Sequence, residues 1–110
     1  MEQIERIKQM EQCLDEVSAA VRNLSVALEQ YEAVREAIRM LDEYLGSRQW
    51  KQDCKADEAG KLPKDLKRGV LSEDGIWNVL EECRQADIRM QEMAAERKGQ
   101  GINKPQNYKI

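Results

Sequence analysis

The side chains of this 110-residue chain that could do chemistry are mainly carboxylates at helical spacing. Carboxylates on one helix face can hold Mg²⁺, as they do in all-α pyrophosphohydrolases, and a bound metal can activate water. The same spacing is ordinary where acids pair with bases along a solvated helix, as Glu32 would with Arg35 and Glu36 with Arg39. We therefore expect no metal site, and a magnesium-dependent hydrolase remains an alternative. The candidate groups are Glu32 and Glu36; Asp53, Asp57 and Glu58; and Glu81, Glu82 and Asp87.

The chain has few residues that could support any other catalytic chemistry. The chain contains no histidine, which removes the commonest general base and metal ligand. Its three cysteines, Cys13, Cys54 and Cys83, form no CxxC pair, so they indicate neither zinc nor a disulfide framework and are expected to be buried thiols of a cytoplasmic protein. We predict no catalytic residue, cofactor or metal. No apolar run has the length of a membrane span, and the N-terminus is too acidic for a signal peptide.

Basic residues gather in the middle of the chain. Residues 47–71 hold 7 Lys/Arg against 4 Asp/Glu, whereas residues 1–46 hold 5 against 10. This segment either neutralises the acidic part of its own chain or is offered to a partner. The pI of 5.1 argues against nucleic acid, since nucleic-acid-binding domains have values above about 9. Weak nucleic-acid binding is a second alternative. The candidate surface for an unidentified protein partner comprises Trp50, Lys61, Lys64, Lys67 and Arg68.

The elements that carry these groups begin with an apolar stripe that runs from Ile4 to Leu45 without glycine or proline. It predicts one helix over residues 2–45, with steps averaging close to 3.5 residues as in a coiled coil. After Tyr31 the stripe shifts by a three-residue stammer. Asn23 is one of the few hints of a break, and we expect continuity there. The candidate self-association seam comprises Val17, Val21, Leu24, Leu28 and Tyr31.

A connector over residues 46–71 follows, and its start and stop signals predict two short helical pieces. Gly46 ends the long helix, and Ser47 caps a helix that ends at Gly60. That helix places Trp50 and Cys54 on one face. The segment 63–68 then predicts a further helical turn closed by a glycine.

A second long helix is predicted over residues 73–98. Ser72 is its cap, and Leu71 and Ile76 stand at the positions of a hydrophobic staple. Gly75 is out of character inside a helix and points to close packing or a close backbone approach. Residues 99–110 lack any period and are expected to form a flexible tail.

One stretch resembles a known family. The run GKLPKDLKRGVLSEDGIWNVL, with EYLGSRQWKQD before it and RIKQMEQCLDE near the start, resembles short bacterial proteins catalogued as a domain of unknown function, number 4298. The resemblance covers residues 1–98. It implies an α-helical bacterial protein and transfers no activity. The matching positions are Tyr44, Ser47, Trp50, Asp53, Gly60, Leu62, Pro63, Leu66, Gly69, Val70, Leu71, Ser72, Glu73 and Asp74.

Together these observations predict an all-α, coiled-coil-like antiparallel helical hairpin of two long helices, forming a single domain over residues 1–98. Its helices would be about 63 Å and about 39 Å long, so part of the longer apolar stripe would stay exposed and favour a homodimer. We expect a cytoplasmic adaptor or regulator rather than an enzyme. The main alternative is a monomeric three-helix bundle, broken near Asn23, that binds another protein.

Overall fold

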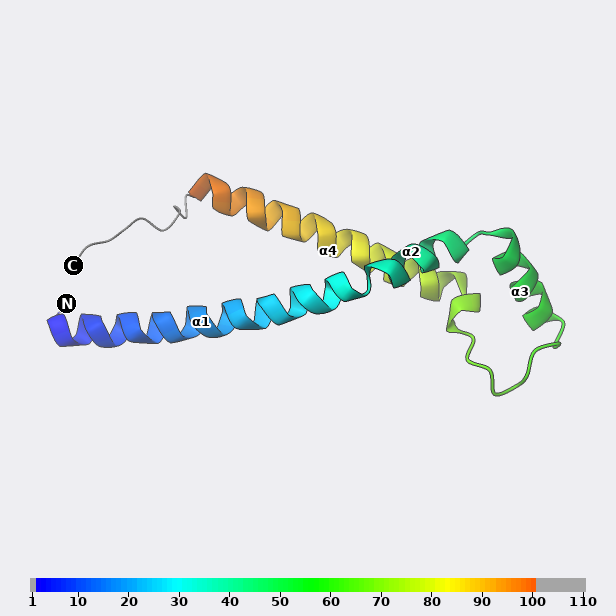
Figure 1. Ribbon diagram of the computed structural model, residues 1–110, viewed down its shortest axis with the longest axis horizontal. Helices are drawn as coiled ribbons and strands as arrows, with labels where there is room; N and C mark the ends of the chain where they lie inside the picture. The colour runs from blue at the N-terminus through cyan, green and yellow to red at the C-terminus, as the bar shows by residue number, and fades with distance from the viewer. Residues whose placement is uncertain (1, 101–110) are drawn as a thin grey trace. The chain divides into compact units, whose positions relative to one another are not determined.

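The computed structural model describes residues 2–100, and in that range the chain is all-α without a strand, which confirms the predicted class. The elements are α1 (Gln3–Ala33), α2 (Arg35–Tyr44), α3 (Arg48–Glu58), the 3₁₀ helix η1 (Gly69–Leu71) and α4 (Glu73–Gln100), as Figure 1 shows. The chain divides into two compact units, Met1–Met40 and Leu41–Ile110.

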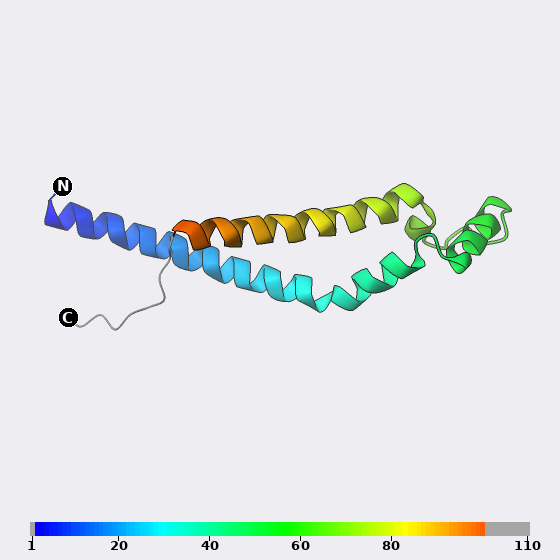
Figure 2. The ribbon, with the colours of Figure 1, turned by 90° about the horizontal axis from the view of Figure 1, so that it is seen from above.

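Helix α1 passes through Asn23 without interruption, so a break at that position, as the three-helix alternative required, is wrong. The single helix expected over residues 2–45 is nevertheless divided, at Val34 (Figure 2). The Val34 N–H donates to the carbonyl of Tyr31, three residues back, at 3.2 Å, and regular spacing resumes when Ile38 donates to Val34. Three-residue bonding is a local overwinding, which is what a stammer in the apolar stripe imposes.

No residue of α1 is buried. The seam residues Val17, Val21, Leu24 and Leu28 are between 42% and 60% exposed, and Tyr31 is half-buried. The helix therefore owes its form to local hydrogen bonds and periodicity, and its apolar stripe remains accessible.

The connector begins as its sequence predicts. Gly46 adopts a left-handed φ of 80° and ends α2, and the Ser47 hydroxyl accepts a hydrogen bond from the Trp50 N–H at 3.1 Å. Gly60, with φ of 70°, follows the end of α3. Both glycines occupy the conformation that other residues adopt with difficulty, so the predicted cap and both stops are confirmed.

The helical turn expected over residues 63–68 is wrong. Leu66 N–H bonds back to the Pro63 carbonyl at 3.2 Å, which closes an isolated turn, and the only helical residues between α3 and α4 are the three of η1. A single helical turn fixes several dihedrals for one hydrogen bond and is unfavourable without continuation. Here the Pro63 carbonyl also accepts a hydrogen bond from the Arg68 guanidinium, so a side chain holds the loop where a helix was expected.

Helix α4 begins at the predicted cap. The Ser72 hydroxyl accepts a hydrogen bond from the Gly75 N–H at 3.3 Å. A Cβ at Gly75 would lie 3.0 Å from the Gly69 carbonyl oxygen, so the predicted close backbone approach is confirmed. Ile76 and Leu80 follow, each only 3% exposed, and they are the only buried residues in the described part of the chain whose side chains are placed. The helix runs two residues beyond the expected end at 98, and residues 101–110 of the expected tail lie outside the described residues.

Candidate interaction surfaces

Side chains of α3 hold η1 through its carbonyl groups. The Trp50 indole Nε1 donates to the Val70 carbonyl at 2.9 Å, and the Cys54 thiol lies 3.6 Å from the Leu71 carbonyl. Both side chains lie on the single face predicted for them. Trp50, one of the residues predicted to form the partner surface, is half-buried and joins α3 to η1.

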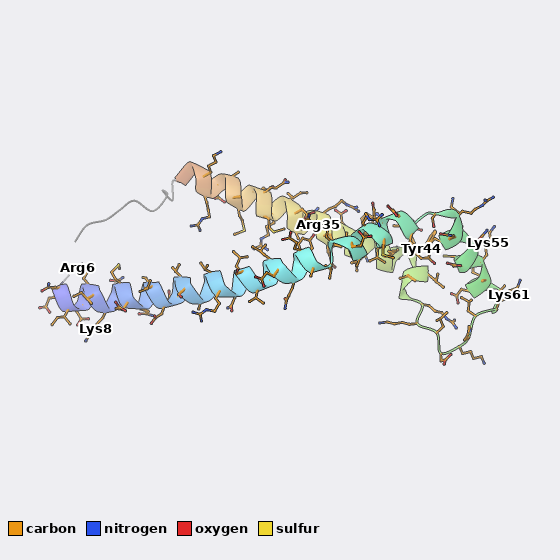
Figure 3. All side chains as sticks on the ribbon, viewed as in Figure 1. Arg6, Lys8, Arg35, Tyr44, Lys55 and Lys61 are labelled. Atoms are coloured by element: carbon orange, nitrogen blue, oxygen red, sulfur yellow. The ribbon has the colours of Figure 1, made fainter. Side chains whose placement is uncertain are left out.

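A second contact joins the end of α2 to α3. The Tyr44 hydroxyl donates to the Asp53 carboxylate, and Figure 3 labels Tyr44 at this junction. The hydrogen bond to Asp53, together with burial and the nearby negative charge, raises the pKa of Tyr44 to about 12. The phenol therefore stays protonated and available as a donor far above neutral pH.

The basic residues of the connector fall into two kinds. Arg68 pairs with Asp57 at 3.0 Å and donates to the Pro63 carbonyl, and its side chain is only 35% exposed. Lys61, Lys64 and Lys67 are exposed, and Figure 3 labels Lys61 just after α3. None of the three makes an ion pair with a described residue. Arg68 is thus integrated in the fold, whereas the three lysines are exposed and form no ion pair with a described residue.

One apolar groove lies beside Lys67, within the unit that begins at Leu41. Its volume is about 420 Å³. The sequence analysis did not anticipate it, because its walls come from three separate elements. It is lined by Leu41 of α2; Lys67, Gly69 and Val70 in and before η1; and Gly75, Ile76 and Val79 of α4.

Three of the carboxylates considered as metal ligands, Glu32, Glu36 and Glu81, pair with an arginine three residues later. Arg39 is bonded to Glu36 and lowers the pKa of that carboxyl, and Arg35 lies 3.7 Å from Glu32. Glu81 accepts from Gln85 and Arg84, which lower its pKa. The predicted pairing of Glu32 and Glu36 is confirmed, and no cluster of three potential ligands occurs among the described residues.

The three cysteines are free thiols in different surroundings. Cys54 and Cys83 are half-buried, and burial raises the pKa of the Cys54 thiol. Cys13 is exposed, so the expectation that all three are buried is wrong for it. It lies on α1, where no residue is buried.

Trp77 differs from Trp50. It is 48% exposed, whereas Trp50 is half-buried and bonds to the Val70 carbonyl. It follows the buried Ile76 directly, and consecutive positions on a helix point about 100° apart.

These features define an all-α protein whose distinctive surfaces are an exposed apolar stripe and a basic-rimmed apolar groove. No helix in residues 2–100 combines the length and apolar character needed to cross a bilayer. A family model described as a domain of unknown function, DUF4298, matches residues 7–93, and the chain belongs to this family. No curated protein and no solved structure matches the chain.

The residues that resemble the family motif are largely those that fold the connector. Tyr44 and Asp53 bond to each other, and Trp50 holds Val70. Ser47 and Ser72 cap helices, and Gly60 ends one. The motif is therefore a folding signature of the unit that begins at Leu41.

Proposed function

We propose that this protein is a non-enzymatic interaction or regulatory module of the cytoplasm that self-associates through α1 and offers its connector to a protein partner. The observation that carries the proposal is the exposure of the α1 seam. Contiguous apolar surface at coiled-coil spacing usually marks an interface. The three free thiols fit a reducing compartment.

The size of the α1 stripe supports a second copy as its partner. Together with Ile7, Met10 and Leu14 of the same stripe, the five seam residues make eight apolar positions at coiled-coil spacing. Roughly half of each apolar side chain is accessible, which over two copies amounts to on the order of 1,000 Å² of removable apolar surface. Specific interfaces begin at about 1,200 Å², a value that backbone and flanking atoms would supply.

The residues beside the seam also suit close pairing. In the heptad that places Ile7 and Met10 on the seam, the flanking positions of the central heptads are small and uncharged. Charges flank the seam only near the helix ends. They are Arg6, Glu11 and Glu32. The small central set comprises Cys13, Ser18, Ala20, Ser25 and Ala27.

Light scattering tests the proposal with a matched pair of variants. The wild type is expected at about twice the 12.8 kDa of one chain. Leu24→Glu puts a charge on the seam and is expected to give the monomer mass, because a desolvated charge is costly. Val26→Glu, exposed but off the seam by heptad position, should leave the dimer intact. A wild-type chain that is monomeric at all concentrations contradicts self-association.

A further inference from the structure

We propose that the apolar groove beside Lys67, here the Lys67 groove, binds an amphipathic helix of another protein, with an apolar side chain in the groove and acidic side chains at Lys67. This assigns a partner class to the connector surface and rests on that half of the proposed function alone. The groove is defined by the seven lining residues given above.

The first argument comes from Gly69. A Cβ built on it would meet no atom within 4 Å, and its φ is outside the left-handed region. Neither crowding nor backbone conformation requires glycine at this position. At Gly75, by contrast, the Gly69 carbonyl stands in the way of a side chain. Because Gly69 lines the groove, its missing side chain leaves room that the free protein does not fill.

The walls of the groove favour a protein segment over a small molecule. Val70 and Val79 are 40% and 47% exposed although they line the groove, whereas Ile76 at its base is buried. Drug-sized ligands are usually about 70–90% buried in their sites. A groove with open walls leaves a small ligand half in water, but it can take one anchoring side chain from a helix that continues across the surface.

The charge at the rim selects an acidic partner. Lys67 is exposed and makes no ion pair with a described residue, while its neighbour Arg68 is already paired with Asp57. Lys61 and Lys64 extend the positive charge along the same connector. Interfaces place opposite charges at their rims, which speeds encounter and excludes partners of like charge. An apolar anchor with acidic neighbours on one helix meets both requirements.

The experiment uses the full-length chain and a fluorescein-labelled synthetic helix of about 18 residues with leucines on one face and glutamates elsewhere. Fluorescence anisotropy measures binding. Gly69→Leu fills the groove and should weaken binding about tenfold or more. Lys67→Glu should weaken it roughly fivefold, an effect that shrinks as salt rises. Lys61→Glu makes the same charge change away from the groove and should alter affinity less than about twofold. A peptide with lysine in place of glutamate should bind about tenfold more weakly.

Two further measurements locate the bound peptide on the protein and separate binding at the groove from binding at the seam. Amide chemical shifts of the wild type with the peptide should move at Val70 and Val79, whatever the stability of the variants. The titration repeated with Leu24→Glu separates the groove from the seam, because peptide binding should persist there even though self-association is lost. Binding that follows the seam variant, tolerates Gly69→Leu in a chain with an unchanged melt, or accepts the lysine peptide equally overturns the proposal. Displacement of the peptide by decanoate at equal affinity would identify a small-molecule site and overturn it as well.

Discussion

Helix α1 and the segment from Tyr44 to Leu80 reach order by different means. α1 has 31 residues and none of them is buried. The segment from Tyr44 to Leu80 contains the two buried side chains, two hydroxyl caps, and side-chain contacts that join positions up to 20 residues apart. Helix α1 is stabilised by hydrogen bonds between nearby backbone groups. The segment from Tyr44 to Leu80 is stabilised by a few specific side-chain contacts and two buried side chains.

This difference implies different sensitivity to substitution. A single change in α1 removes little from the folded chain, because few contacts depend on it, and instead alters what the helix can bind. A single change at a contact of the second region leaves a buried group unsatisfied or a void unfilled. The same substitution made in each region can therefore show how much more stability is lost in the second region than in α1.

The largest expected effect is at the core. Leu80→Ala should lower the free energy of unfolding by about 2–5 kcal/mol, since it removes a buried side chain and leaves a cavity. Leu14→Ala, the same change at an exposed position of α1, should cost less than about 0.5 kcal/mol in urea melts of the monomer. Equal losses at the two sites would show that α1 is packed in solution.

The next effect separates the basic residues of the connector. Arg68→Met removes the pair with Asp57 and the bond to the Pro63 carbonyl, and should cost about 1.5–3 kcal/mol in the same melts. Lys64→Met removes an equal charge from an exposed position and should stay within about 0.5 kcal/mol. If both variants melt alike, Arg68 belongs to the exposed set after all.

Replacing serine by alanine should change the free energy of unfolding in opposite directions in the two regions. Ser72→Ala removes the cap of α4 and should cost about 1 kcal/mol. Ser25→Ala lies in the interior of α1, where alanine is the better helix former, and should stabilise by about 0.5 kcal/mol. Denaturant midpoints give both values. A neutral Ser72→Ala would mean that the start of α4 does not depend on this cap.

The smallest effect is on alkaline stability. A phenol whose pKa is raised in the folded state stabilises the fold fully below its unfolded pKa of about 10, and that contribution is lost as pH rises through about 12. The melting temperature of the wild type should therefore fall more steeply between these values than that of Tyr44→Phe. Ultraviolet titration of tyrosinate should show the late phase only in the wild type. Parallel melting curves would contradict a hydrogen bond from Tyr44 to Asp53 in solution.

Much of the local structure could be predicted from single residues. Ser47 and Ser72 cap the helices they precede, and Gly46 and Gly60 follow helix ends, because each signal acts within three or four residues. The break at Val34 was signalled only as a shift in the apolar stripe. Only the backbone structure shows that this shift produces a hydrogen bond between residues three positions apart.

Contacts between distant residues could not be predicted in the same way. The basic residues next to Arg68 in the sequence predict a partner surface there, yet Arg68 pairs with Asp57, 11 positions earlier. The same surface is predicted to include Trp50, although Trp50 bonds to a carbonyl 20 positions later. The antiparallel pairing of the two long helices remains a prediction.

By itself the sequence determined the helical class, the ends of α3 and the start of α4, and the exposed period of α1, because these depend on hydrogen bonds and side-chain directions within one or two turns. Only the tertiary structure decided which charges are used internally and where an apolar groove is left open. The internal charge pair joins Asp57 of α3 to Arg68 just before η1, and the groove lies between α2, η1 and α4. The space that Gly69 leaves beside Lys67 exists because three elements surround it, and no spacing along the chain encodes that distance.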